Sequence, residues 1–371
     1  MLTHLDDYLV HQTPEPVAHP DTGDRNFYDR FFFNGYARAG DLFFGAALGL
    51  YPNRRVMDAA FSVVRGGRQH ALHASRLAPV ERTETRVGPI AVDVLAPLDQ
   101  LALRVAPNAH GLEADLVFRS RTVAIEEPRF TLRRNGRVFM DATRLTQFGT
   151  WEGWIAVDGA RVAIAPGDVL GCRDRSWGVR PVGEPEGGAP GMAPQFFWLW
   201  APLHFDDVCT HLQVNEDANG RRLAASGVLV RTDRRDETAI QTMAAVDHRV
   251  RWRAGTRRAD AADLTLVPHS DAAHTIALEP LLTFQMLGLG YVNPEWGHGH
   301  WKGEEAVGGS AWTLADLDPL DPRHLHVQQL CRTRMGGRVG LGVLEQLVIG
   351  PHAPSGFGDL FDGAREGATS C

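Results

Sequence analysis

The segment FTLRRNGRVFM, residues 130–140, joins two short alternating runs through the dipeptide Asn135-Gly136. Both residues of such a two-residue turn must accept a positive φ, and Asn-Gly does so more readily than almost any other pair. The segment therefore predicts a β-hairpin made of Phe130–Arg133 and Arg137–Met140.

Short apolar runs that end at turn residues continue on both sides of this hairpin. They predict strands at Leu42–Tyr51, Val56–Val64, Leu101–Val105, Leu112–Phe118, Gln195–Phe205, Leu223–Val230, Val246–Trp252, Leu264–Val267, Thr275–Leu278 and Val339–Ile349. Helical periodicity is weak, and the best helical segment is Arg25–Phe32, after a polar arm of residues 1–26. Many short strands separated by closely spaced turns favour an all-β protein, either a barrel or a sandwich.

The length of 371 residues suggests two domains. Several short matches recur in the same order in both halves, such as Cys-Arg-Asp-Arg at 172–175 and Cys-Arg-Thr-Arg at 331–334. Together they favour an internal duplication of one β unit. The Gly/Pro-rich stretch 182–194 has the composition of a linker. We therefore expect one domain over residues 1–185, including the N-terminal arm, and a second over 186–371.

Composition excludes several classes of function. The net charge is −7 without a basic block, so a nucleic-acid partner is not expected. The four cysteines are scattered, as is typical of reduced thiols in a cytoplasmic protein. Met1–Val10 lacks the pattern of a signal peptide, and the longest apolar stretch has ten residues, about half of a membrane span. No motif for ATP, nicotinamide or serine-hydrolase chemistry is present, so we expect no cofactor. The oligomeric state is left open.

Asp174 is the first candidate for catalysis, in the run Cys172–Gly178. On a strand, Arg173 and Arg175 point to the face opposite Asp174, so that the carboxyl group could face a barrel interior alone. Burial there would keep it protonated, as a general acid must be. The alternative is a structural carboxylate that accepts backbone hydrogen bonds.

A second candidate is the run EWGHGHWKGE, residues 295–304. As a strand it would place His298, His300 and Lys302, the only lysine of the chain, on one face and Trp301 on the other. The histidines could act on a ligand by acid/base chemistry or hydrogen bonding, could bind a metal, or could belong to an exposed polar face. Because no third ligand stands nearby in the sequence, no metal is expected.

Aromatic residues are the third feature. Phe31-Phe32-Phe33 and the run Phe196–Trp200 either fill a core or line a cavity for one hydrophobic ligand. In the second case Tyr36, Trp177 and Trp198 are the expected pocket residues, together with Trp301 and Lys302.

The run Asp-Arg-Ser-Trp-Gly at 174–178, followed by Phe-Phe-Trp-Leu-Trp-Ala-Pro at 196–202, resembles the lipocalin-like hydroxyneurosporene synthase (carotenoid 1,2-hydratase)/AttH-type superfamily. Residues 294–304 look like one branch of that group. The resemblance implies two lipocalin-like antiparallel β-barrel domains. It also implies addition of water to a prenyl double bond without a cofactor, with the family's catalytic aspartate at Asp174.

These features lead to two functional hypotheses. The favoured one is a cofactor-independent acid/base enzyme on a hydrophobic, terpenoid-like alkene or alcohol. It would be a hydratase or dehydratase, or an isomerase or cyclase that shares the carbocation. Asp174 would donate the proton, and His298 and His300 would handle water or a hydroxyl group. The alternative is a non-catalytic carrier of a small hydrophobic molecule, which needs no acid.

Overall fold

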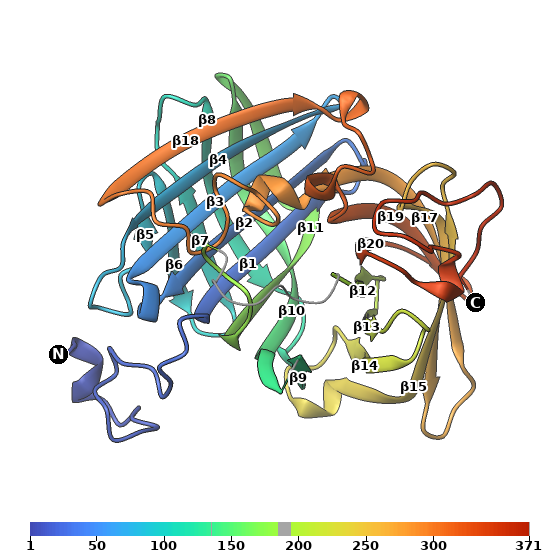
Figure 1. The fold of residues 1–371 in the computed structure, drawn as a ribbon, viewed down its shortest axis with the longest axis horizontal. Coiled ribbons are helices and arrows are strands. Elements are labelled where there is room, and N and C mark those ends of the chain that lie inside the picture. Colours follow the sequence, from blue (N-terminus) through green and yellow to red (C-terminus); the bar gives the residue numbers. More distant parts are fainter. Residues whose placement is uncertain (135, 185–193, 371) are drawn as a thin grey trace.

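The computed structural model describes residues 1–134, 136–184 and 194–370. These residues form twenty strands in two antiparallel sheets that lie side by side (Figure 1). Their helices are short 3-10 turns, and none of the described helices is long and apolar enough to cross a membrane. The all-β prediction is confirmed.

The first sheet has twelve strands and curls into a nearly closed, barrel-like shape (Figure 1). Its order is β18-β4-β3-β2-β1-β11-β10-β8-β7-β6-β5, with β9 paired to β10. The strands are β1 (Phe27–Ala37), β2 (Leu42–Tyr51), β3 (Val56–Arg65), β4 (Arg68–Leu77), β5 (Arg86–Val87), β6 (Ile90–Ala96), β7 (Gln100–Val105), β8 (Leu112–Ser120), β9 (Ile125–Arg134), β10 (Arg137–Val157), β11 (Ala160–Val179) and β18 (Glu305–Thr313).

The second sheet is a closed barrel of eight strands, because β12 pairs with both β13 and β20. The two lipocalin-like units expected from the sequence are therefore a closed barrel and a larger, barrel-like sheet. The strands are β12 (Phe196–His204), β13 (Val208–Glu216), β14 (Arg222–Arg231), β15 (Ile240–Trp252), β16 (Ala259–Pro268), β17 (His274–Gln285), β19 (Val327–Met335) and β20 (Arg338–Ile349).

One strand of the first sheet comes from the C-terminal half of the chain. Between β17 and β19 the chain leaves the second barrel, and β18 pairs with β4 from Glu305 opposite Arg76 to Thr313 opposite Arg68. Residues 305–313 thus complete the first sheet although they follow the expected boundary near residue 185. Most of the expected linker, residues 185–193, lies outside the described residues. The domain boundary and the internal duplication stay predictions.

The hairpin that decided the fold class is present, since β9 and β10 pair with Arg134 opposite Arg137. Gly136 in the turn has a φ of 77°, which glycine accepts without strain. Asn135 lies outside the described residues.

The helix predicted at Arg25–Phe32 is wrong, because Phe27–Ala37 forms strand β1. Its backbone is paired on both sides, with β2 and with β11. Aromatic side chains are buried on both faces of β1, which removes the alternation that marks a half-exposed strand. Tertiary pairing and burial outweigh the local pattern here.

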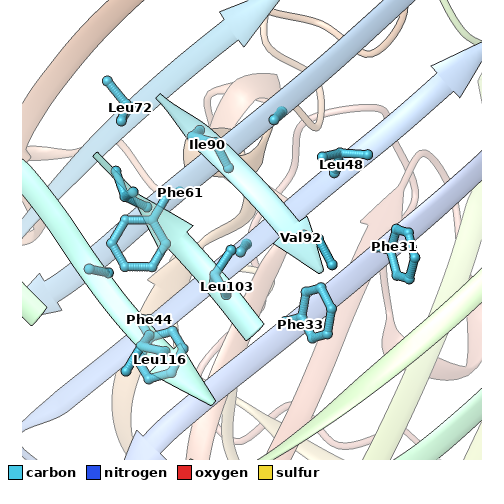
Figure 2. Close-up of a cluster of buried hydrophobic side chains, with 14 of the residues drawn as sticks. Phe31, Phe33, Phe44, Leu48, Phe61, Leu72, Ile90, Val92, Leu103 and Leu116 are labelled. Atoms are coloured by element: carbon cyan, nitrogen blue, oxygen red, sulfur yellow. The ribbon is translucent and has the colours of Figure 1, made fainter. Parts of the chain in front are cut away.

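The two faces of β1 pack into different cores. Phe31 and Phe33 point into the first sheet, where they join Phe44, Phe61 and other apolar side chains (Figure 2). Phe32 and Tyr36 point the other way, into a cluster shared with Trp200, Phe284 and Leu330 of the second barrel. This second cluster holds the two sheets together.

Trp151 of β10 anchors the core of the first sheet. Its side chain is 1% exposed and meets the rings of Phe33, Phe44 and Phe118 edge-on at 5.3 to 5.7 Å. The indole Nε1 donates a hydrogen bond of 2.9 Å to the backbone oxygen of Asn34. Trp151 therefore fixes β10 against β1.

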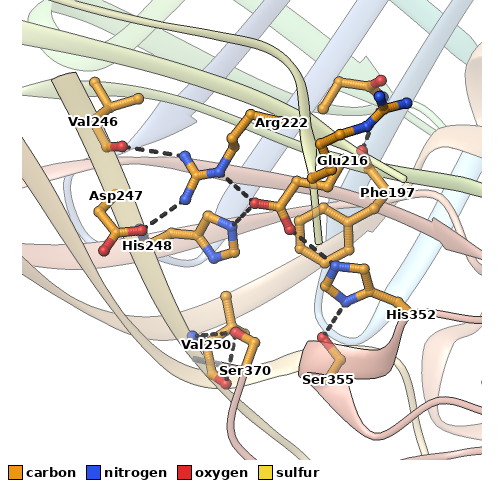
Figure 3. Close-up of polar contacts among 12 residues, drawn as sticks. Phe197, Glu216, Arg222, Val246, Asp247, His248, Val250, His352, Ser355 and Ser370 are labelled. Carbon is orange, nitrogen blue, oxygen red and sulfur yellow. Dashed lines mark hydrogen bonds and ion pairs between the residues drawn. The ribbon is translucent and has the colours of Figure 1, made fainter. Parts of the chain in front are cut away.

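A buried carboxylate organises one end of the second barrel (Figure 3). Glu216 accepts hydrogen bonds from Nε2 of His248 at 3.0 Å and Nε2 of His352 at 2.9 Å, and pairs with Arg222 at 2.6 Å. His352 is bonded in turn to the Ser355 hydroxyl at 2.7 Å. Burial alone would raise the pKa of Glu216, but the hydrogen bonds from the histidines and the charges of His248 and Arg222 lower it to about 2.

We expect Trp151→Ala to lower the free energy of unfolding by about 3–5 kcal/mol, because it leaves a large cavity and an unpaired carbonyl. Urea denaturation measures this change. Trp154, which is partly exposed and lies against Arg161, serves as the control. Trp154→Ala should cost about 1 kcal/mol or less. An equal loss in both variants would contradict this account of the core.

Glu216 should contribute to acid stability. Its pKa in the folded protein lies below the ordinary value of 4.5, so its contribution is complete above about pH 4.5. It is lost as the pH falls from there through about 2. Glu216→Gln should therefore flatten the fall in melting temperature across this range. Glu237→Gln, at an exposed position, should leave the fall unchanged. An unchanged acid profile in Glu216→Gln would refute the assignment.

Candidate active site

A cavity of about 500 Å³ lies between the first sheet and the second barrel. Strands β1, β9, β10 and β11 contribute one wall, β12, β13 and β20 the facing wall, and residues 290–300 part of the rim. Its lining combines aromatic and ionisable side chains, including Tyr28, Phe196, Trp198 and Tyr291 with Glu127, Arg134, Arg144, Asp174, Arg180, His298, His300, His326 and Glu345.

Asp174 of β11 faces this cavity and is 9% exposed. The alternation expected along the strand is present, because Arg173 and Arg175 lie over Phe118 and Phe31 in the core of the first sheet. The strand thus separates the acid from its two neighbouring cations.

The expectation that Asp174 stands alone in a barrel interior is wrong. It lies on the face of β11 that the second barrel covers, as Cys172 two residues earlier does. Other charged groups are close: the charges of Arg144 and Glu127 both act on its pKa. The cavity belongs to both sheets, which sequence periodicity within one strand does not reveal.

Burial raises the pKa of Asp174 to about 6. The charge of Arg144 opposes this rise, while the negative charge of Glu127 adds to it. No residue within the described ranges donates a hydrogen bond to the Asp174 carboxyl group. A buried carboxyl group of this kind keeps its proton up to about pH 6 and can release it to a bound molecule.

Glu127 of β9 remains ionised beside it. Arg144 donates two hydrogen bonds to Oε2 of Glu127, at 2.8 Å from Nε and 2.5 Å from Nη2, and Thr146 donates one of 2.5 Å to Oε1. Burial alone would raise the pKa of Glu127, but the charge of Arg144 and these hydrogen bonds keep it below the ordinary value. Of the two carboxyl groups on this wall, Asp174 is therefore the one that keeps its proton up to about pH 6.

Glu345 of β20 is the corresponding ionised carboxylate of the facing wall. It accepts hydrogen bonds from His326 at 2.9 Å, Gln328 at 2.6 Å and Trp198 at 3.2 Å. Burial would raise its pKa, but the hydrogen bond and charge of His326 and the bond from Gln328 lower it. The environments of Asp174 and Glu345 thus move their pKa values in opposite directions.

The strand predicted at residues 295–304 is wrong, because these residues form turns and loop before β18 begins at Glu305. Gly299 has a φ of 73°, and its amide donates a 2.7 Å hydrogen bond to Asp58. The histidines therefore do not share a strand face with Lys302. His298 and His300 nevertheless both reach the cavity, because the loop folds against its rim.

Both ring nitrogens of His298 are occupied. Nδ1 lies 3.0 Å from both Arg30 and Arg180, and Nε2 lies 2.8 Å from the backbone oxygen of Leu289. Burial, with the charges of Arg30 and Arg180, holds the pKa of His298 well below its ordinary value. The ring is therefore neutral and positions two arginines. The catalytic roles of His298 and His300 stay predictions.

The five residues expected to contact a substrate are separated in space. Trp198 lines the cavity, whereas Tyr36 is fully buried in the cluster between the sheets. Trp177 and Trp301 are 40% and 48% exposed. Lys302 lies over the Trp296 ring at 4.8 Å and beside a second, much smaller pocket. Tyr36, Trp177, Trp301 and Lys302 are thus outside the lining of this cavity.

Sequence reasoning missed Glu127, Arg144, His326 and Glu345. Glu345 carried a usable signal, because it is an acid within the apolar run Val343–Ile349, where a charge must have a partner. The others stand in polar stretches that look like ordinary surface. The described residues contain no group of three or more His, Cys, Asp or Glu side chains placed to hold a metal ion.

Residues 2–358 match the model of a family described as a family of unknown function, DUF8625. The chain belongs to this family. A comparison with curated proteins finds none that matches the chain.

Three solved structures share its fold. An AttH-type protein from Nitrosomonas europaea gives a TM-score of 0.54 at 12% identity, over 86% of this chain and 92% of that chain. Kievitone hydratase from Nectria haematococca gives a TM-score of 0.50 at 13% identity, over 86% of this chain and 88% of that chain. CghA, solved with Sch210972, gives a TM-score of 0.50 at 12% identity, over 87% of this chain and 89% of that chain. The AttH-type, lipocalin-like resemblance is thereby confirmed for the fold.

Proposed function

We propose that this protein is a cofactor-independent acid/base enzyme that acts on a hydrophobic, terpenoid-like alkene or alcohol. The reaction is hydration or dehydration, or isomerisation or cyclisation through the same carbocation. The observation that carries the proposal is Asp174, a buried carboxyl group that faces a large aromatic cavity and has its pKa raised to about 6. A carrier would have no use for such an acid.

The charges around the cavity favour an uncharged substrate. The lining contains three arginines, Arg134, Arg144 and Arg180, and three carboxyl groups, Glu127, Asp174 and Glu345. Their positive and negative charges nearly cancel, so the cavity has no strong field of one sign that would attract an ion. Aromatic walls and a few placed polar groups are typical of sites for hydrophobic ligands.

In the hydration direction, Asp174 gives its proton to one carbon of the double bond and becomes a carboxylate. The other carbon becomes a tertiary cation, which the aromatic rings that line the cavity can stabilise. A water oxygen then forms a bond to the cation and releases a proton, which gives an alcohol. Dehydration is the reverse, and cyclisation results when a second double bond captures the cation instead.

We also propose that the enzyme works in the cytoplasm. Cys172, Cys209 and Cys331 are free and buried in the structure, which fits a reducing compartment.

Asp174→Asn should lower turnover by at least about 100-fold, because the amide cannot supply the proton. The assay incubates the protein with a panel of prenyl alcohols and alkenes, including geraniol, linalool and citronellol, and identifies products by gas chromatography with mass spectrometry. Asp168→Asn, at an exposed position of the same strand, should leave turnover unchanged. Full activity of Asp174→Asn would exclude the acid role. Tight binding of a panel member without turnover by the wild type would favour the carrier.

The pH profile should report Asp174. Its protonated form is the active one, so kcat/KM for hydration should fall as the pH rises above about 6. Arg144 and Arg30 lower this pKa, whereas Glu127 and Glu345 raise it. Asp174→Glu should retain a falling limb at a shifted pH. A rate that rises through this range would contradict the proposal.

A further inference from the structure

A histidine that sequence reasoning missed reaches the cavity from the side of the second barrel. His326 stands directly before β19, is 3% exposed and lines the cavity. Its Nε2 lies 2.9 Å from Oε1 of Glu345 on the neighbouring strand β20. The Tyr291 ring meets the imidazole edge-on at 4.6 Å, so the ring is held on two sides.

Glu345 determines which nitrogen of His326 carries the proton. Its carboxylate is ionised and can only accept hydrogen bonds, so Nε2 of His326 must donate. Gln328 and Trp198 donate to the same carboxylate at 2.6 and 3.2 Å, which fixes its orientation. In the neutral ring this leaves Nδ1 with a free lone pair.

Nδ1 of His326 is buried and has no hydrogen-bond partner among the described residues. His248, which bonds Glu216, has an unpaired Nδ1 as well, but only His326 of these two lines the cavity. His298 uses both ring nitrogens, and so does His352, which bonds Glu216 and Ser355. A buried nitrogen without a partner is costly unless a ligand or water pairs with it.

A chain of hydrogen bonds links this pair to the strand that carries the acid. Gln328, which bonds Glu345, accepts a hydrogen bond of 3.0 Å from Asn34 of β1. Asn34 in turn accepts one of 2.9 Å from the backbone amide of Cys172 on β11, two residues before Asp174. All of these side chains are buried. These hydrogen bonds thus fix the position of one cavity wall relative to the other.

We propose that His326 is a second catalytic residue, a general base that exchanges a proton with the reacting water or hydroxyl group, and that Glu345 is its positioning residue. This inference rests on the proposed function. It assigns the acid to the first sheet and the base to the second barrel.

In hydration, Asp174 loses a proton to the alkene carbon. The water oxygen forms a bond to the cation, and Nδ1 of His326 takes one proton from that water. The product is the alcohol, with Asp174 ionised and His326 carrying an extra proton. Exchange with solvent returns a proton to Asp174 and removes one from His326, so no other reactant is needed.

Two isotopes separate the acid step from the base step. The probe is citronellol. In D2O, Asp174 transfers a deuteron to the alkene, and when it then takes a proton back from the cation, the regenerated alkene carries deuterium. The label of H2 18O enters only when water captures the cation. His326→Gln should reduce 18O incorporation by about 100-fold and change deuterium incorporation only a few-fold. Asp174→Asn should abolish the incorporation of both deuterium and 18O.

The matched control is His352→Gln, which removes another buried histidine bonded to a glutamate. It should lower the melting temperature while leaving both incorporation rates per folded molecule unchanged. In the wild type without substrate, 15N NMR should show His326 with hydrogen on Nε2 and none on Nδ1. Glu345→Gln should abolish this fixed tautomer. It should also lower 18O incorporation.

The outcomes distinguish this inference from the proposed function. Wild-type rates of 18O incorporation in His326→Gln, or a 15N spectrum with hydrogen on Nδ1, would overturn the role of His326 and leave Asp174 untouched. Equal loss of both labels in His326→Gln would likewise overturn a base role. Absence of both labels in the wild type would overturn the proposed function itself.

Discussion

Burial of β1 and β11 on both faces is the constraint on which the rest of the structure depends. One face packs the core of the first sheet, and the other packs against the second barrel through Phe32, Cys172 and Trp200. Because these central strands are covered on both sides, the two sheets are held in contact. The cavity is the part of this contact that apolar side chains do not fill, and Asp174 lies beside them on the same face.

This position explains the electrostatics of the site. A carboxyl group on the covered face loses its solvation by water, which favours the neutral acid. Glu127 and Glu345 avoid that outcome, because Arg144 and His326 with Gln328 provide hydrogen bonds that favour their ionised forms. Of the three carboxyl groups in the cavity, two are therefore ionised, whereas Asp174 keeps its proton up to about pH 6. Such a separation of pKa values is the basis of acid/base assignment in many enzymes.

The sequence predicted strands well where a run is apolar throughout, as at Leu42–Tyr51, or where a turn is sharp, as at residues 130–140. It failed at Arg25–Phe32, where burial on both faces removes the alternation, and at residues 295–304, where loop contacts such as Gly299 with Asp58 decide the conformation. Asp174 was found because its flanking arginines draw attention to the strand. His326 and Glu345 were not, because they meet only when β19 pairs with β20.

The central claim is that Asp174 keeps its proton up to about pH 6 inside the cavity. The most direct test is a titration of its carboxyl carbon by 13C NMR in protein with labelled aspartate, with Asp174→Asn used to assign the signal. The account predicts a midpoint near pH 6, with Asp174 protonated below it. A midpoint at or below the ordinary value of 3.8 would contradict it, because the carboxyl group would then be ionised and unable to donate a proton.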